Sequence, residues 1–236
     1  MGARNRSLAC LYLWENRMRL ARLLGLLAVA LLLVPYAYAD GTVSMEFTGV
    51  NGAHDNQYYV SPYYGTMNGS PVVLFCDDIK NEVYYWETWT ANVTNLGTAV
   101  NTPGGFANTR YGGVSGSMVY SDPTTAYKEV AWLTTQFAGN PGDYVSLQYA
   151  IWDIMNPGSE PTTYGDVQTW LNDAAANYKN IDPYHFEIVT NVGPLCLTGQ
   201  VQEFIVQTPE PGTLALLLCG LLALAAFTIS RARLAA

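Results

Sequence analysis

The apolar positions that follow residue 40 alternate with polar ones and predict β-strands in the first part of the chain. The clearest segments are 43–47, 58–60 and 72–75, and an aromatic run at 83–86 precedes a threonine-rich strand that ends near Val93. Met67-Asn68-Gly69 predicts a turn before 72–75, because Asn-Gly readily adopts the positive φ angles of a tight hairpin. Residues 95–124 are rich in Gly, Asn, Thr and Ser, so we expect a long loop there.

After residue 124 the apolar residues recur at helical spacing. Ala126, Val130, Leu133 and Phe137 share one helical face, and the Gly and Pro residues at 139–142 end that helix. We expect two more helices, at 143–155 with Asp143 as N-cap and at 165–178, before strands return at 185–190 and 201–207. Strands and helices in separate blocks predict an α+β fold, a β-rich single domain with a central three-helix segment.

The C-terminal residues have three parts in a fixed order. Pro209-Glu210-Pro211 precedes the apolar run 214–229, and Arg231 and Arg233 follow it. Sixteen helical residues span about 24 Å at about 1.5 Å each, close to the roughly 30 Å hydrocarbon core of a bilayer. We therefore expect a transmembrane helix at 214–229, with the arginines on the cytoplasmic side.

The N-terminal residues have the pattern of a secretory signal peptide. Arg17, Arg19 and Arg22 precede the apolar run 23–34, and Ala37 and Ala39 are the small residues that signal peptidase recognises. We expect a signal peptide at 1–39, with Met18 as an alternative start of the chain. The exported domain would then be 40–208, long enough for one domain with a sizeable core.

The tail at 209–236 resembles the PEP-CTERM sorting signal of Gram-negative bacteria, on Pro209-Glu210-Pro211, the Leu/Ala-rich run and the closing arginines. The resemblance implies that an exosortase recognises and cuts the tail. An inner-membrane-anchored precursor would thereby be released to the cell surface or the secreted matrix. An ordinary C-terminal membrane anchor is the alternative, and both place the domain outside the cytoplasm.

Charge narrows the choice of partners. The chain has a net charge of −8, but seven of its eleven basic residues lie in the two terminal segments. Residues 40–208 hold 17 carboxylates and only Lys80, Arg110, Lys128 and Lys179, a net charge near −13. Nucleic acid and anionic membrane surfaces are therefore poor partners, whereas a cationic surface or a neutral glycan is compatible.

Residues for conventional catalysis are scarce in this domain. Its histidines are His54 and His185, neither with metal-ligand spacing, and HExxH, GxSxG and phosphate-loop motifs are absent. We therefore expect a binding or structural module rather than an enzyme, with no catalytic residues, no metal and no cofactor. A calcium site at Asp77 and Asp78 is an alternative that no EF-hand loop supports.

The domain holds two cysteines, Cys76 and Cys196. In an oxidising compartment they would form one disulfide closing a loop of about 120 residues, worth about 4–5 kcal/mol by chain entropy. Two free thiols are the other alternative that the residues alone allow.

Two segments point to different chemistry for Cys76. Residues 73–78 form a strand that ends in Cys76 and then acid, and 147–153 (Leu-Gln-Tyr-Ala-Ile-Trp-Asp) follow a predicted helix about 70 residues later. Over about residues 58–152 this order resembles the thioester domains of bacterial surface adhesins. The resemblance implies a bond between Cys76 and Gln148. Leu147 stands where those domains have Thr.

A thioester must be held together by the fold and shielded from water until an amine arrives. The residues expected around this bond are Phe75, Asp77, Trp132, Tyr149 and Trp152. Two functions follow as hypotheses: covalent capture of a surface amine through Gln148, or non-covalent binding of polysaccharide by exposed aromatic rings in a disulfide-stapled domain.

Overall fold

The computed structural model describes residues 41–55, 57–113, 122–159, 164–193 and 200–208, together with Gly220. The chain divides into one unit of Tyr38–Thr208 and another of Met1–Ala37 with Pro209–Ala236. The expected signal peptide and, Gly220 apart, the sorting tail lie outside the described residues. Within the described ranges, no helix combines the length and the apolar character that crossing a membrane requires.

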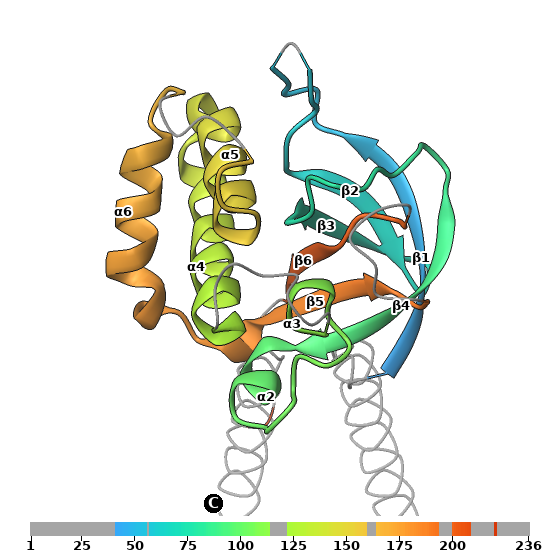
Figure 1. Ribbon diagram of the computed structural model, residues 1–236. Coiled ribbons are helices and arrows are strands. Elements are labelled where there is room, and N and C mark those ends of the chain that lie inside the picture. Colours follow the sequence, from blue (N-terminus) through green and yellow to red (C-terminus); the bar gives the residue numbers. More distant parts are fainter. Residues whose placement is uncertain are drawn as a thin grey trace, which may run out of the picture. The chain divides into compact units, whose positions relative to one another are not determined.

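Six antiparallel strands close a barrel in the order β1-β2-β3-β6-β5-β4 (Figure 1). Their bounds are β1 Gly41–Val50, β2 Tyr63–Met67, β3 Ser70–Cys76, β4 Thr88–Asn95, β5 Phe186–Asn191 and β6 Phe204–Gln207. In β1 the apolar residues Val43, Met45 and Phe47 are buried at alternate positions, as period-two patterning requires. Asn68 (φ 49°) and Gly69 (φ 79°) turn the chain between β2 and β3, which confirms the predicted Asn-Gly turn.

Three longer helices pack together on one side of the barrel (Figure 1). They are α4 (Pro123–Gln136), α5 (Tyr144–Met155) and α6 (Val167–Asn177), and they confirm the predicted three-helix segment. Asp122 caps α4 by accepting a hydrogen bond from the backbone N–H of Thr124, and Pro123 occupies the first turn. Short helices complete the fold: α2 Leu96–Val100, α3 Arg110–Gly113, η1 Phe137–Gly139, η2 Pro141–Asp143, η3 Tyr178–Asn180 and η4 Pro183–His185.

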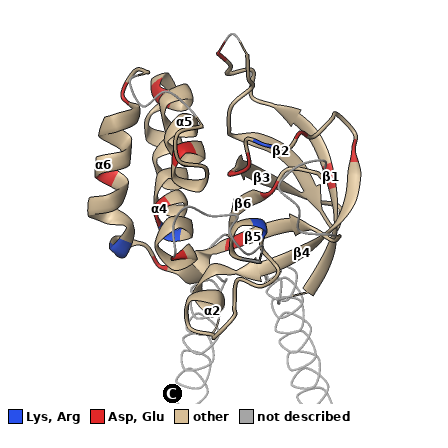
Figure 2. Cartoon of the chain, in the orientation of Figure 1, with Lys and Arg blue, Asp and Glu red and all other residues tan. Residues whose placement is uncertain are grey.

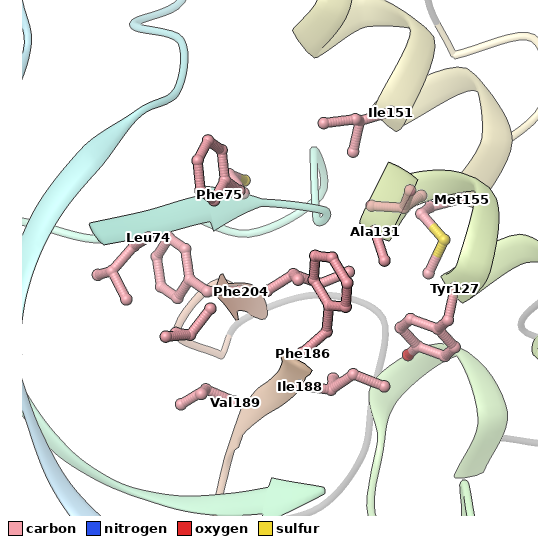
Figure 3. Packing of buried hydrophobic residues seen from close by; sticks show 14 of the residues in the cluster. Leu74, Phe75, Tyr127, Ala131, Ile151, Met155, Phe186, Ile188, Val189 and Phe204 are labelled. Carbon is pink, nitrogen blue, oxygen red and sulfur yellow. The ribbon is translucent and has the colours of Figure 1, made fainter. Parts of the chain in front are cut away.

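The hydrophobic core is continuous from the barrel to the helices (Figure 3). Tyr127 and Ala131 of α4 face the barrel, as do Ile151 and Met155 of α5, opposite Phe186 and other strand residues. Helix α5 buries nine of its twelve residues, Gln148 among them. A helix buried on nearly all sides can hold a polar side chain only where that side chain is hydrogen-bonded.

The α+β class is confirmed, but two local predictions are wrong. Residues 58–60 form only an isolated bridge between Tyr59 and His54, and the second strand starts later, at Tyr63. The expected loop at 95–124 contains α2 and α3, although 114–121 lie outside the described residues. Asn95 caps α2 through the N–H of Thr98, and burial of the α2 residue Leu96 stabilises this Gly- and Thr-rich segment. Asp143 precedes α5 as expected but makes no capping hydrogen bond with its side chain.

Candidate functional site: a buried Cys-Gln pair

Cys76 and Gln148 meet where the end of β3 packs against α5. The carboxamide Nε2 of Gln148 donates a hydrogen bond to the backbone carbonyl of Cys76 at 2.6 Å. Both residues have no exposed surface. The two residues that the sequence resemblance pairs are therefore neighbours in the fold, although they lie 72 positions apart along the chain.

Ser61 holds this pair from a third side. Its backbone N–H donates to Oε1 of Gln148 at 3.0 Å, and its Oγ accepts a hydrogen bond from the N–H of Cys76 at 2.9 Å. The Gln148 carboxamide is thus fixed at both its oxygen and its nitrogen. Sequence reasoning missed Ser61, because nothing in its local pattern distinguishes it from any other serine before a strand.

The thiol of Cys76 donates to the backbone carbonyl of Asp78, with a sulfur–oxygen distance of 3.4 Å. Burial raises the pKa of this thiol well above its usual range, and the nearby carboxylate of Asp78 raises that pKa further. The indole N–H of Trp152 acts in the opposite direction and lowers the pKa of the thiol. This N–H has no acceptor in good hydrogen-bond geometry among the described residues, so it remains available to the sulfur.

The expected aromatic surroundings of the bond are only partly assembled. Trp152 is adjacent to the thiol, and Tyr149 packs against it with ring centroids 5.8 Å apart. Phe75 lies in the core, 5.2 Å from the ring of Phe137. Trp132 instead packs against a tryptophan of α6 and borders a separate pocket, so the part of a shield predicted for it has no support in these contacts.

Asp77, the remaining predicted neighbour, belongs to a buried charge cluster with Asp78, Arg110 and Glu203, all four fully buried. Neither carboxylate oxygen of Asp77 has a hydrogen-bond partner among the described residues. Burial raises the pKa of Asp77 well above its usual range, and the negative charges of Glu203 and Asp78 add to this rise. The pKa of Glu203 is also raised by burial, although hydrogen bonds, from Thr190 above all, lower it in part.

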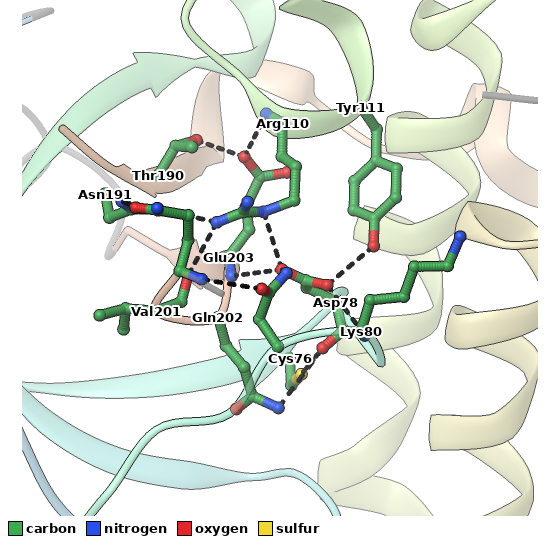
Figure 4. A network of polar contacts seen from close by, with 12 residues as sticks. Cys76, Asp78, Lys80, Arg110, Tyr111, Thr190, Asn191, Val201, Gln202 and Glu203 are labelled. Carbon is green, nitrogen blue, oxygen red and sulfur yellow. Dashed lines mark hydrogen bonds and ion pairs between the residues drawn. The ribbon is translucent and has the colours of Figure 1, made fainter. Parts of the chain in front are cut away.

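Arg110 joins the elements of this cluster (Figure 4). Its Nε lies 2.8 Å from Oδ2 of Asp78, and its backbone N–H donates to Oε2 of Glu203 at 2.7 Å. Its Nη2 donates to Oδ1 of Asn191 at 2.7 Å and to the carbonyl of Val201 at 2.8 Å. Because Asp78 is two residues beyond Cys76, the cluster fixes the chain immediately after the thiol.

A pocket of about 230 Å³ opens beside the pair. Its lining residues are mostly aromatic or aliphatic: Phe47, Val50, Gln57, Tyr58, Tyr59, Tyr63, Ile79, Asn81, Glu82, Val83, Tyr85, Trp152 and Gln202. Three of them reach the surroundings of the thiol. Trp152 and Tyr63 are close enough to Cys76 to interact with it electrostatically. Nε2 of Gln202 donates a hydrogen bond to the Asp78 carbonyl, which also accepts a hydrogen bond from the Cys76 thiol. A small molecule in this pocket would therefore be near the Cys-Gln pair.

The other predicted site residues contribute less. Cys76 is a free thiol in the structure, and Cys196 lies outside the described residues, so the disulfide stays a prediction. His54 and His185 are far apart in the chain, and no cluster of three or more His, Cys, Asp or Glu side chains suited to a metal occurs in the described segments. The calcium alternative at the two aspartates gains no support. The signal-cleavage residues Ala37 and Ala39 and the sorting motif Pro209-Glu210-Pro211 also lie outside these segments.

The fold and the site together define a β-barrel domain with a flanking helical layer and a buried Cys-Gln pair. No family model matches the chain, and no curated protein matches it. Among solved structures, the N-terminal thioester domain of a surface protein from Clostridium perfringens is similar to it, with a TM-score of 0.42 and 9% identity. The similarity covers 70% of this chain and 98% of that domain.

Proposed function

We propose that the domain forms an internal thioester between Cys76 and Gln148 and uses it to capture an amine covalently outside the cell. The observation that carries this proposal is the doubly hydrogen-bonded carboxamide of Gln148, held by the carbonyl of Cys76 at 2.6 Å and by the N–H of Ser61 at 3.0 Å. This fixation holds the carboxamide against the backbone of the residue that carries the thiol, and thioester formation requires the thiol and the carboxamide to be held close together.

Bond formation requires the Cys76 sulfur to add to the carboxamide carbon of Gln148. The carboxamide oxygen gains negative charge in this step, and the Ser61 N–H that already donates to it is placed to stabilise that charge. The carbon–nitrogen bond then breaks, and the thiol proton leaves with the nitrogen. The products are one thioester and one ammonia molecule.

Capture of an amine is a second step, in which the Gln148 acyl group passes from sulfur to nitrogen. An amine nitrogen bonds to the Gln148 acyl carbon, the carbon–sulfur bond breaks, and an amine proton passes to the sulfur. The result is an N-substituted Gln148 amide and a Cys76 thiol. Burial favours this neutral thiol over a thiolate, and the Trp152 indole N–H stabilises the negative charge that develops on the departing sulfur.

The terminal segments support an extracellular location for this chemistry. The signal-peptide pattern at 1–39 and the tail at 209–236 suit a precursor that is anchored in the inner membrane of a Gram-negative bacterium and then cut by an exosortase. Replacing Pro209-Glu210-Pro211 with three alanines should keep the chain in the membrane fraction. Release of this variant to the same extent as the wild type would exclude processing at that motif.

Labelling with a fluorescent primary amine tests the proposed reaction on the exported full-length chain. Cys76→Ala and Gln148→Ala should each abolish covalent labelling, since each removes one partner of the bond. Gln168→Ala, which removes a glutamine on the exposed face of α6, should label as the wild type does. Labelling that survives Cys76→Ala, or that is absent from the folded wild type, would contradict the proposal. A Cys76→Ala variant that loses stability while labelling is absent in both chains would favour the disulfide.

A further inference from the structure

The pocket beside the Cys-Gln pair has exposed aromatic rings at its opening. Tyr58 is 39% exposed, Tyr59 55% and Tyr85 54%, and all three line the pocket. Beneath them Trp152 is only 2% exposed, with its ring centroid 5.5 Å from that of Tyr58 in an edge-on arrangement. The opening thus presents aromatic rings, and two of the lining residues, Trp152 and Tyr63, lie near the Cys76 thiol.

Among the described residues that line the pocket, one is charged, Glu82. Its side chain is exposed, and its Oε2 accepts a hydrogen bond from the hydroxyl of Tyr84 at 2.6 Å. The exposed Lys80 lines a neighbouring pocket together with Glu82, but across the described ranges no Lys or Arg forms an ion pair with Glu82. These ranges hold 15 carboxylates against four basic residues, one of which, Arg110, is buried, and basic positions are correspondingly sparse along the ribbon in Figure 2. The field at the pocket therefore favours a cationic ligand.

Size limits the ligand further. A volume of about 230 Å³ is below the range of roughly 300–1,000 Å³ that is usual for drug-sized ligands, so the pocket has room for about one ring. The walls combine ring faces with the side-chain amides of Gln57 and Gln202, which suit a body with both apolar and hydroxyl-bearing surfaces.

We propose that this pocket binds an amino-sugar residue of a polysaccharide. The C–H face of the sugar ring packs against the exposed tyrosines, its hydroxyl groups bond to the side-chain amides, and its ammonium group interacts with Glu82. The thin alkyl stem of a lysine side chain would leave most of the aromatic opening unused, so a protein amine is the less suitable ligand. Binding itself does not depend on the thioester. The added step, in which the bound amine attacks Gln148, rests on the proposed function.

The test uses the full-length Cys76→Ala variant, which cannot form the thioester, so that only reversible binding is measured. Isothermal titration with a β-1,4-linked glucosamine trimer should show binding. The N-acetylated trimer has the same rings without the charge, and should bind about three- to fivefold more weakly, as expected for losing one exposed ion pair. A lysine-containing tripeptide should bind more weakly than the glucosamine trimer.

Side-chain replacements on the same background assign the site. Tyr85→Ala and Tyr58→Ala should each weaken binding about tenfold through loss of ring contact, and circular dichroism should show both variants folded. Tyr64→Ala removes an exposed tyrosine of β2 that does not line the pocket, and should change nothing. Glu82→Gln should weaken binding of the glucosamine trimer about three- to fivefold but leave the N-acetylated trimer unaffected, since both changes remove the same interaction.

Equal binding of the two trimers, tighter binding of the lysine peptide, or an equal effect of Tyr64→Ala would overturn the amino-sugar assignment. The two proposals fail separately. Glucosamine binding without amine labelling of the wild type would retain the pocket and reject the thioester. Amine labelling without glucosamine binding would retain the thioester and reject the amino-sugar pocket.

Discussion

The buried charge cluster gives a quantitative prediction for the frame of the site. Arg110 provides the only positive charge next to Asp77, Asp78 and Glu203 among the described residues, and all four side chains are fully buried. Replacing it by Met in Arg110→Met keeps much of the apolar stem but leaves three buried carboxyl groups without a cation. Removing one partner of a buried ion pair typically costs about 3–5 kcal/mol, so we expect a loss of this size in the free energy of unfolding at about pH 7.5.

The pH dependence of this loss has a definite sign. The pKa values of Asp77 and Glu203 are raised in the folded domain, and Arg110 lowers both, so the variant should raise them further. A carboxyl group with a raised folded pKa lets the folded state bind more protons, and its penalty grows as pH rises from the unfolded pKa, near 4, to the folded one. The loss caused by Arg110→Met should therefore be smaller, by about 1 kcal/mol or more, at about pH 5 than at about pH 7.5.

Urea unfolding of the wild type and the variant at the two pH values measures this difference directly. Lys179→Met, which removes an exposed cation, should leave stability nearly unchanged at both. A loss below about 1 kcal/mol for Arg110→Met, or a loss that does not change with pH, would show that Arg110 does not stabilise the three buried carboxyl groups.

Three further predictions concern the site and the barrel. Trp152→Phe keeps an aromatic ring but removes the indole N–H near the Cys76 sulfur. Amine labelling should therefore slow about tenfold or more, while the thioester still forms. An unchanged labelling rate would exclude a role for the indole N–H. Ser61→Ala leaves the buried N–H of Cys76 without its hydrogen-bond acceptor, so it should lower the free energy of unfolding by about 1–3 kcal/mol. Mass spectrometry should also show a smaller fraction of the chain with the thioester. Unchanged stability would exclude a stabilising role for this hydrogen bond. Gly65→Ala places a Cβ 2.6 Å from a backbone carbonyl oxygen of β1. It should lower the free energy of unfolding, measured in urea, by about 1–3 kcal/mol. Gly139→Ala, which has open space around the added Cβ, should not lower it.

Helices α4, α5 and α6 were predictable because their apolar residues repeat at helical spacing and Gly, Asn and Pro separate them. Strand β2 was not, since Tyr63–Met67 shows no clear alternation and contains Gly65, which is required by the close approach of β1. Helix α2 was missed because its Gly- and Thr-containing sequence has a low helix propensity, and burial of Leu96 and Ala99 outweighs it.

The candidate site divides in the same way. The resemblance of the two segments led us to expect Cys76 and Gln148 close together, and the structure has the Gln148 carboxamide hydrogen-bonded to the Cys76 backbone, whereas a bond between the two side chains stays a prediction. Ser61, Arg110 and Glu203 act through contacts with residues far away in the chain, and their local sequence gives no indication of them. Trp132 was expected to shield the thioester because it is aromatic, but from its position on α4 it packs against α6.

The intact mass of the exported chain, taken without reductant at mildly acidic pH, tests the central claim most directly. The thioester predicts a mass one ammonia lower than the processed sequence, a deficit that methylamine abolishes by coupling to Gln148 and that Cys76→Ala never shows. A deficit of two hydrogens that a reductant restores would identify the Cys76–Cys196 disulfide. That result, or a mass equal to the sequence, would contradict the thioester.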